Sequence, residues 1–166
     1  MVLIDPDMRA KFPRSAFTRR GLEIFLAEAV RSAKLTGSVS VLLAGDAEIR
    51  RLNREFRGKD KATDVLSFPA GENQGRSRSA GDLAVSVETA SREAALRGHP
   101  LETELRILLL HGVLHLAGFD HETDNGEMAR KENALRKKLG LQQGLIERAA
   151  KPTPRPRRIA TRSRKP

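Results

Sequence analysis

Three of the four histidines in this chain lie close together, at His111, His115 and His121. Residues 107–116 are mostly apolar, which predicts a buried helix. His111 and His115 are four residues apart, so on a helix they lie one turn apart on the same face. Gly118 can adopt the positive φ that ends a helix. We expect the chain to turn there and to bring His121 back toward the other two histidines.

Three neutral imidazoles that converge on one point are typical ligands of zinc. A site with three protein ligands keeps a fourth position open for water, which is the pattern of catalytic rather than structural zinc. A single histidine on an apolar helix is usually a core residue, but the second and third histidines at this spacing favour a metal site. We therefore predict one zinc ion per chain, bound by His111, His115 and His121.

The spacing His-x3-His-x2-Gly-x2-His is also that of the metzincin peptidases. In those enzymes the residue after the first histidine is a glutamate that acts as the general base, whereas here it is Gly112. A metallopeptidase needs a carboxylate to accept a proton from the metal-bound water. The glycine therefore argues against a peptidase.

The 166 residues predict one domain, residues 1–150, followed by a basic tail, residues 151–166. The tail contains seven of the lysines and arginines and no acid, so the net charge of +10 leaves only +3 for the domain. Four prolines and very few apolar residues predict that the tail is disordered. Two interpretations stay open, a solvated end and an arm that binds a polyanion such as RNA.

The chain contains no cysteine, which excludes disulfides and thiolate ligands and fits a reducing compartment. No apolar run approaches the ~20 residues of a membrane span. Residues 1–11 include two aspartates and no long apolar segment, so we expect no signal peptide. These features predict a cytoplasmic protein without a membrane partner.

The hydrophobic pattern predicts α+β architecture, a small mixed sheet of three to four strands packed by four to five helices. The zinc site is expected on a late helix, and the chain ends in the disordered basic tail. The expected strands are residues 2–4, 39–44, 64–69 and 81–86. The expected helices start at Ser15, at Asp46 as a cap, at residues 86–87, near Pro100, and after a capping box at residues 124–127.

The stretch from His111 to His121 closely resembles the signature of the YbeY family, bacterial endoribonucleases also called rRNA maturation factors. Residues 52–69, which read LNREFRGKDKATDVLSFP, resemble a second block of the family, and Gly81-Asp82-Leu83 resembles a third. The three blocks occur in the family's order, and the resemblance covers roughly residues 39–140.

This resemblance implies that the three histidines are zinc ligands and that Arg57 is the family's functional arginine, which we expect to be catalytic. It implies a metal-dependent endoribonuclease, a hydrolase of RNA phosphodiester bonds that is specific for single strands. The implied roles are small-subunit rRNA 3′ end maturation and ribosome quality control. The implied partners are single-stranded RNA, ribosomal RNA and the small ribosomal subunit, with no small-molecule cofactor.

Several chemical questions stay open at this point. Because Gly112 has no carboxylate, a general base must come from elsewhere, and the nucleophile is either water or the RNA 2′-OH. Asp120 either orients a ligand imidazole or simply forms a turn. Besides the endoribonuclease, two other classes remain: a zinc peptidase, and a ribosome-assembly protein whose zinc only braces the fold.

Overall fold

The computed structural model describes residues 1–71 and 79–141. Residues 72–78 and 142–166 lie outside this part. Most of the loop expected between residues 70 and 80 falls there. The basic tail at residues 151–166 and the domain boundary at residue 150 fall there as well, so both stay predictions.

A four-stranded mixed sheet forms the centre of the molecule, which confirms the α+β prediction. Its strands are β1 (Val2–Ile4), β2 (Ser38–Ala44), β3 (Val65–Pro69) and β4 (Ser79–Ser86). The spatial order is β1-β2-β4-β3, with β1 and β4 each parallel to β2, and β3 antiparallel to β4. Among the described residues, β3 is therefore an end strand, and its outer edge has no neighbouring strand.

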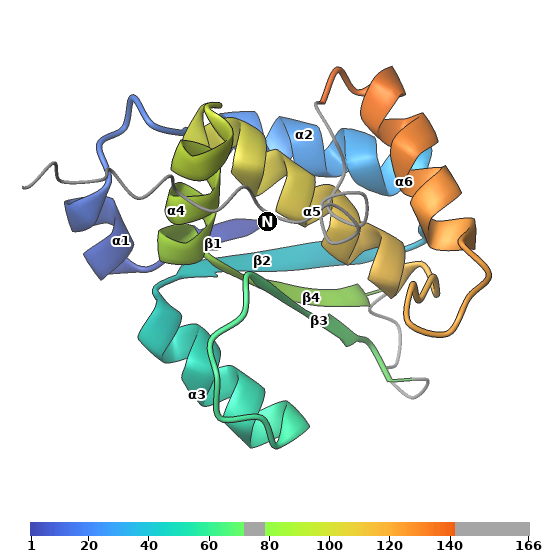
Figure 1. Cartoon of the computed structure of the whole chain (residues 1–166), viewed down its shortest axis with the longest axis horizontal. Helices are drawn as coiled ribbons and strands as arrows, with labels where there is room; N and C mark the ends of the chain where they lie inside the picture. The colour runs from blue at the N-terminus through green and yellow to red at the C-terminus, as the bar shows by residue number, and fades with distance from the viewer. Residues whose placement is uncertain (72–78, 142–166) are drawn as a thin grey trace, which may run out of the picture.

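Within the described residues the sheet is packed by six helices: α1 (Pro6–Lys11), α2 (Arg19–Ser32), α3 (Asp46–Arg57), α4 (Val87–Arg97), α5 (Leu101–Leu116) and α6 (Glu127–Lys138). Figure 1 shows α3 on one face of the sheet and α2, α4, α5 and α6 on the other. Helix α1 was not predicted from the sequence; it has six residues and begins at Pro6, after the capping side chain of Asp5.

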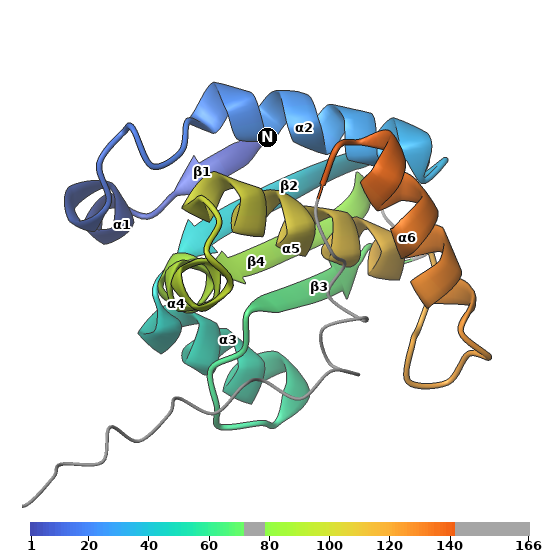
Figure 2. The same cartoon turned by 45° about the horizontal axis from the view of Figure 1, so that its top comes forward.

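The histidine helix α5 is the most enclosed helix. It packs against α2, α4, α6, β3 and β4, and Figure 2 shows it crossing the sheet between α2 and α4. Its sequence is apolar on nearly all sides, as expected for a helix surrounded by other elements. His111 is buried within this helix, and His115 is half-buried. Within the described residues, no helix is both long and apolar enough to cross a membrane.

Two of the expected helix starts were wrong. Ser15 does not cap α2; the hydroxyl of Thr18 accepts the Gly21 N–H instead, because the helix begins only at Arg19. Asp46 is the first residue of α3 rather than its cap, and the capping position belongs to Gly45. At α6, Asp124 of the expected capping box accepts the N–H groups of Gly126 and Met128, but the capping position belongs to Gly126.

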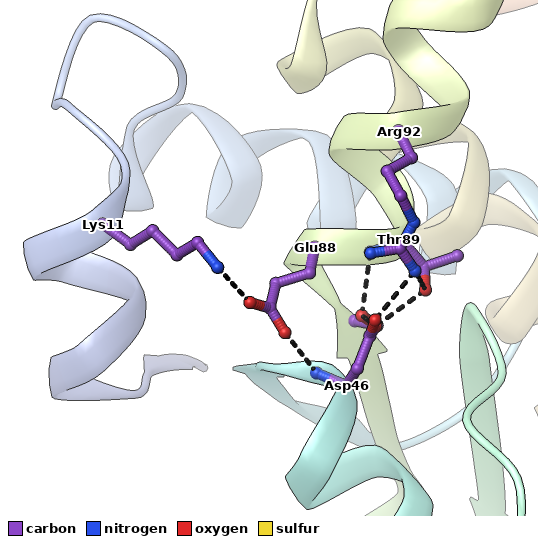
Figure 3. A network of polar contacts seen from close by, with 6 residues as sticks. Lys11, Asp46, Glu88, Thr89 and Arg92 are labelled. Atoms are coloured by element: carbon purple, nitrogen blue, oxygen red, sulfur yellow. Dashed lines mark hydrogen bonds and ion pairs between the residues drawn. The ribbon is translucent and has the colours of Figure 1, made fainter.

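The side chain of Asp46 instead joins α3 to α4 (Figure 3). Its carboxylate accepts hydrogen bonds from three residues of the neighbouring strand and helix: Ser86, Thr89 and Arg92. In return, Glu88 at the start of α4 accepts the backbone N–H of Asp46 and pairs with Lys11 of α1. These contacts tie together the first turns of two helices that follow adjacent parallel strands, and Glu88 pairs one of the N–H groups at the start of α3. They fix the position of α3, the helix that carries Arg57.

Candidate metal centre

His111 and His115 face the same point at the end of α5. Their Nε2 atoms are 3.1 Å apart, and their ring centroids are 4.7 Å apart. The four-residue spacing therefore places both imidazoles on one face of the helix, as predicted.

The turn after α5 brings the third histidine to the same place. Gly118 has φ = +89°, and the N–H of Phe119 donates to the carbonyl of Leu114, so the chain reverses out of the helix there. The ring centroid of His121 is 5.2 Å from the centroids of both other rings. One nitrogen from each histidine lies within 4.8 Å of the other two. The three histidines predicted from the sequence therefore form one cluster that could hold a metal ion.

The distance between the nitrogens of His111 and His115 and the protonation state of His115 both fit zinc. In a tetrahedral site with Zn–N distances of 2.0–2.1 Å, neighbouring nitrogens are about 3.3 Å apart, close to the separation of the His111 and His115 nitrogens. Burial lowers the pKa of His115 to about 4, and the nearby His111 and His121 contribute to the same shift. The imidazole of His115 is therefore neutral near pH 7, as a metal ligand must be.

A buried carboxylate that the sequence analysis missed contacts the cluster. Glu132 of α6 is 1% exposed, and its Oε2 lies 3.4 Å from Nδ1 of His111. Metal-bound histidines commonly donate their second N–H to such a carboxylate, which fixes the ring and its tautomer. The sequence did contain a signal, because Glu132 lies between Met128 and Leu135 on the apolar face of its helix.

Asp120, which the sequence left open between two roles, shapes the turn that carries His121. Its carboxylate accepts the Glu122 N–H at 3.1 Å and the Thr123 hydroxyl at 3.0 Å. The Glu122 and Thr123 hydrogen bonds, in that order, hold the pKa of Asp120 below its usual range, and His115 and His121 lower it further. The carboxylate in contact with a ring of the histidine cluster is that of Glu132, which lies beside His111.

Gly112, between His111 and His115, is tightly packed. A Cβ atom added there would lie 2.8 Å and 3.1 Å from the two methyl carbons of Leu83 and 3.4 Å from Oγ of Ser67. Leu83 is 1% exposed and has little room to move. A glutamate after the first histidine would therefore have to displace the buried side chain of Leu83, which gives the departure from the metzincin pattern a structural reason.

Arg57 is the last residue of α3 and reaches β3 rather than the histidines. Its Nη2 donates to the carbonyl of Ser67 at 2.9 Å. Asp64 and Ala70 of the same segment bond to β4, so the alternation of an antiparallel ladder directs the Ser67 carbonyl to the open edge. The Ser67 hydroxyl in turn lies 3.4 Å from the carbonyl of Gly112 on α5. Ser67 thus links the predicted arginine to the histidine helix.

The fourth histidine, His99, does not belong to the cluster. It is buried in the connection between α4 and α5, and its Nε2 lies 3.0 Å from Oε2 of the buried Glu104. His99 lies just before the start of α5, whereas the histidine cluster lies at the other end of the helix.

The family model described as Endoribonuclease YbeY matches residues 9–140. The chain belongs to this family. It is 54% identical over 138 residues to the Endoribonuclease YbeY of Koribacter versatilis, which covers 81% of this chain and 86% of that protein. It is 58% identical over 107 residues to that of Solibacter usitatus, which covers 64% of this chain and 69% of the relative. The solution structure of a Thermotoga maritima protein superimposes with a TM-score of 0.55 at 28% identity, over 97% of this chain and 100% of that one.

The three sequence blocks that resemble the YbeY family meet around the second half of α5. Leu83 of the third block packs on Gly112 of the first, and Ser67 of the second block touches the same glycine. Gly81 has φ = +142°, and a Cβ atom there would lie 2.4 Å from the carbonyl oxygen of Phe68. The family match ends at residue 140, before the basic tail.

Proposed function

We propose that this YbeY family member is a zinc-dependent endoribonuclease that cleaves single-stranded RNA in the cytoplasm. Its proposed substrate is ribosomal RNA on the small ribosomal subunit, where it matures the 3′ end and serves ribosome quality control. Support comes from family membership and from relatives named Endoribonuclease YbeY at 54% and 58% identity. The chain's three histidines and Arg57 supply the groups that this chemistry requires.

The proposed metal ligands are His111, His115 and His121, which hold one zinc ion per chain. When bound, zinc supplies a Lewis acid and lowers the pKa of a coordinated water toward ~7. Glu132 holds the ring of His111 in place, and the turn at Gly118 holds His121 against the helix. Each ligand is thus positioned by a different part of the fold.

The proposed role of Arg57 is to bind the phosphate that is cleaved. Only Nη2 of its guanidinium donates to Ser67, so the remaining N–H groups are available to phosphate oxygens. The bond to Ser67 also fixes the direction of the guanidinium. The nucleophile is either water or the RNA 2′-OH. Gly112 rules out a general-base carboxylate only at its own position, so another group can activate either nucleophile. The ends of the cleavage products distinguish these two, since attack by the 2′-OH leaves a cyclic phosphate.

One observation carries the proposal: His111 and His115 of α5 converge with His121 of the following turn, and a peptidase glutamate at Gly112 would collide with the buried side chain of Leu83. The test incubates zinc-loaded protein with single-stranded RNA, duplex RNA and casein, with Arg57→Ala as a control for contaminating nuclease. We expect cleavage of the single strand alone, and much slower cleavage by the variant. Cleavage of casein only would establish a peptidase, and no cleavage of any substrate would favour an assembly protein braced by metal.

A further inference from the structure

Phe56, in the last turn of α3, is an unusually exposed aromatic residue. Its exposed fraction is 61%, whereas the other five phenylalanines of the chain are buried or half-buried. An exposed phenylalanine loses the favourable burial that a ring of this size normally gains. A bound partner that covers the ring would restore that burial.

The ring of Phe56 rests against a second phenylalanine. Its centroid is 5.4 Å from that of Phe68 on β3, with an angle of 68° between the ring planes, an edge-to-face pair. Phe68 is half-buried and packs against the small apolar cluster between α3 and the sheet. One ring is therefore anchored in the fold, and the other extends from it into solvent.

The aromatic pair is adjacent to the arginine contact described above. Phe56 and Arg57 are consecutive on α3, and their partners Phe68 and Ser67 are consecutive on β3. The guanidinium and the aromatic pair therefore lie at the same junction between the end of α3 and β3. Ser67 also contacts Gly112 between the two helical histidines. Strand β3 thus contacts the aromatic pair through Phe68 and the histidine helix through Ser67.

The end of α3 and the loop after it carry cations without acidic partners. Among the described residues, Arg57, Lys59 and Lys61 make no ion pair, whereas Arg50 and Arg54 are both paired with Asp60. Asn53 orders this loop: its Nδ2 donates to the carbonyl of Lys61 at 2.8 Å, and its own carbonyl accepts the N–H of Lys59. The cations are therefore presented on a fixed loop.

Other exposed apolar side chains lack this combination. Leu96 on α4 is 69% exposed, but it has no aromatic ring and its neighbour Arg97 is paired with Glu93. Ile24 on α2 is 56% exposed, and the adjacent Glu23 pairs with Arg19. An exposed ring beside unpaired cations is the arrangement with which proteins bind single-stranded nucleic acid, through base stacking and phosphate contacts.

We propose that Phe56, supported by Phe68, is a stacking platform for one nucleobase of single-stranded RNA, next to the phosphate held by Arg57. This inference rests on the proposed function and extends it to a base-binding subsite. A base inside a duplex is covered on both faces by its neighbours, so a stacking platform selects unpaired strands. Stacking accepts every base, so the subsite adds affinity with little sequence preference.

The chain contains no tryptophan and no tyrosine, which makes a direct optical test available. Phe56→Trp places a lone indole at the platform, and Leu96→Trp places one at an exposed site on α4 as the matched control. Each variant is titrated with a short single-stranded RNA and with the same backbone carrying abasic residues. We expect saturable quenching of the indole at position 56 by RNA with bases, little quenching by the abasic strand, and little quenching at position 96.

A second measurement compares the binding of RNA by Phe56→Leu and Phe56→Tyr. Leucine keeps apolar volume but cannot stack as a ring, so we expect affinity to fall by roughly 5- to 150-fold, the range of one base–aromatic stack, while tyrosine keeps most of it. Thermal unfolding checks that both variants are folded, which the exposure of Phe56 favours.

The possible outcomes are distinct. Wild-type affinity in Phe56→Leu, or equal quenching at positions 56 and 96, would overturn the platform while leaving RNA cleavage intact. Quenching at position 56 that grows with protein concentration in the absence of RNA would assign the ring to contact between copies of the chain and would also overturn it. Base-dependent quenching without any RNA cleavage would uphold the platform and refute the proposed enzyme.

Discussion

The carboxylate of Glu132 lies 3.4 Å from Nδ1 of His111, so α6 holds the ring whose other nitrogen faces the metal cluster. Both side chains are buried. A carboxylate on Nδ1 favours the tautomer that leaves Nε2 free to bind metal, and it increases the basicity of the ligand. Glu132 is therefore a positioning residue for the proposed site rather than a ligand.

Glu132→Gln should lower zinc affinity by about 10- to 100-fold, the usual cost of losing such a partner. Glutamine is of similar size, so packing against α5 is preserved and the change mainly removes charge. Competition with a chromophoric chelator measures the affinity, and Glu127→Gln on the exposed face of the same helix is the control. Equal affinity in the two variants would show that Glu132 has no influence on the metal.

His115→Ala should remove most of the bound zinc, because only two histidines remain in the cluster. Metal binding is linked to folding, so the bound ion should raise the melting temperature of the wild-type protein. Addition of a strong chelator should therefore lower the melting temperature of the wild type and leave that of the variant nearly unchanged. Full zinc occupancy of the variant by metal analysis would disprove the assignment of His115.

Arg57→Ala should reduce RNA cleavage by roughly 10²-fold or more, the scale of removing one transition-state donor, while zinc content and stability stay close to wild type. Arg57→Lys should restore only part of the rate, since a point charge does not replace the planar guanidinium. Arg54→Ala, three residues earlier on α3, is the control because that arginine is paired with Asp60. Similar rates for the Arg57 and Arg54 variants would contradict a specific role for Arg57.

The sequence was most informative where residue types and local spacing decide the structure. Four-residue spacing placed His111 and His115 together, and the glycine at position 118 predicted the turn that returns His121. Contacts between residues that are far apart in the sequence could not be predicted from local spacing. Glu132 reaches His111 from 21 residues away, and Arg57 reaches β3 only because the sheet places that strand beside α3.

The role of Asp46 was also not predictable from the local sequence. Its lowered pKa makes the stability of the protein depend on pH. An aspartate before an amphipathic stretch resembles a helix cap, yet its carboxylate faces the start of α4 instead. Burial opposes ionisation, but hydrogen bonds from Ser86, Thr89 and Arg92 outweigh it and hold the pKa of Asp46 below its usual range. Stabilisation from a lowered carboxylate pKa is present above the unfolded-state pKa, about 3.9, and is lost as the pH falls through the folded-state pKa.

Asp46→Asn should therefore lower the free energy of unfolding by about 1 kcal/mol at pH 7, a value kept modest because Arg92 is solvent-exposed. The difference between wild type and variant should shrink as the pH falls from about 5 toward 3, since the wild-type carboxylate then also becomes neutral. Urea unfolding of both metal-free proteins across this pH range measures the difference in the free energy of unfolding. The exposed Glu28→Gln serves as the control for loss of one negative charge. A difference that stays constant down to pH 3 would mean that Asp46 stabilises α3 and α4 by its shape rather than by its charge.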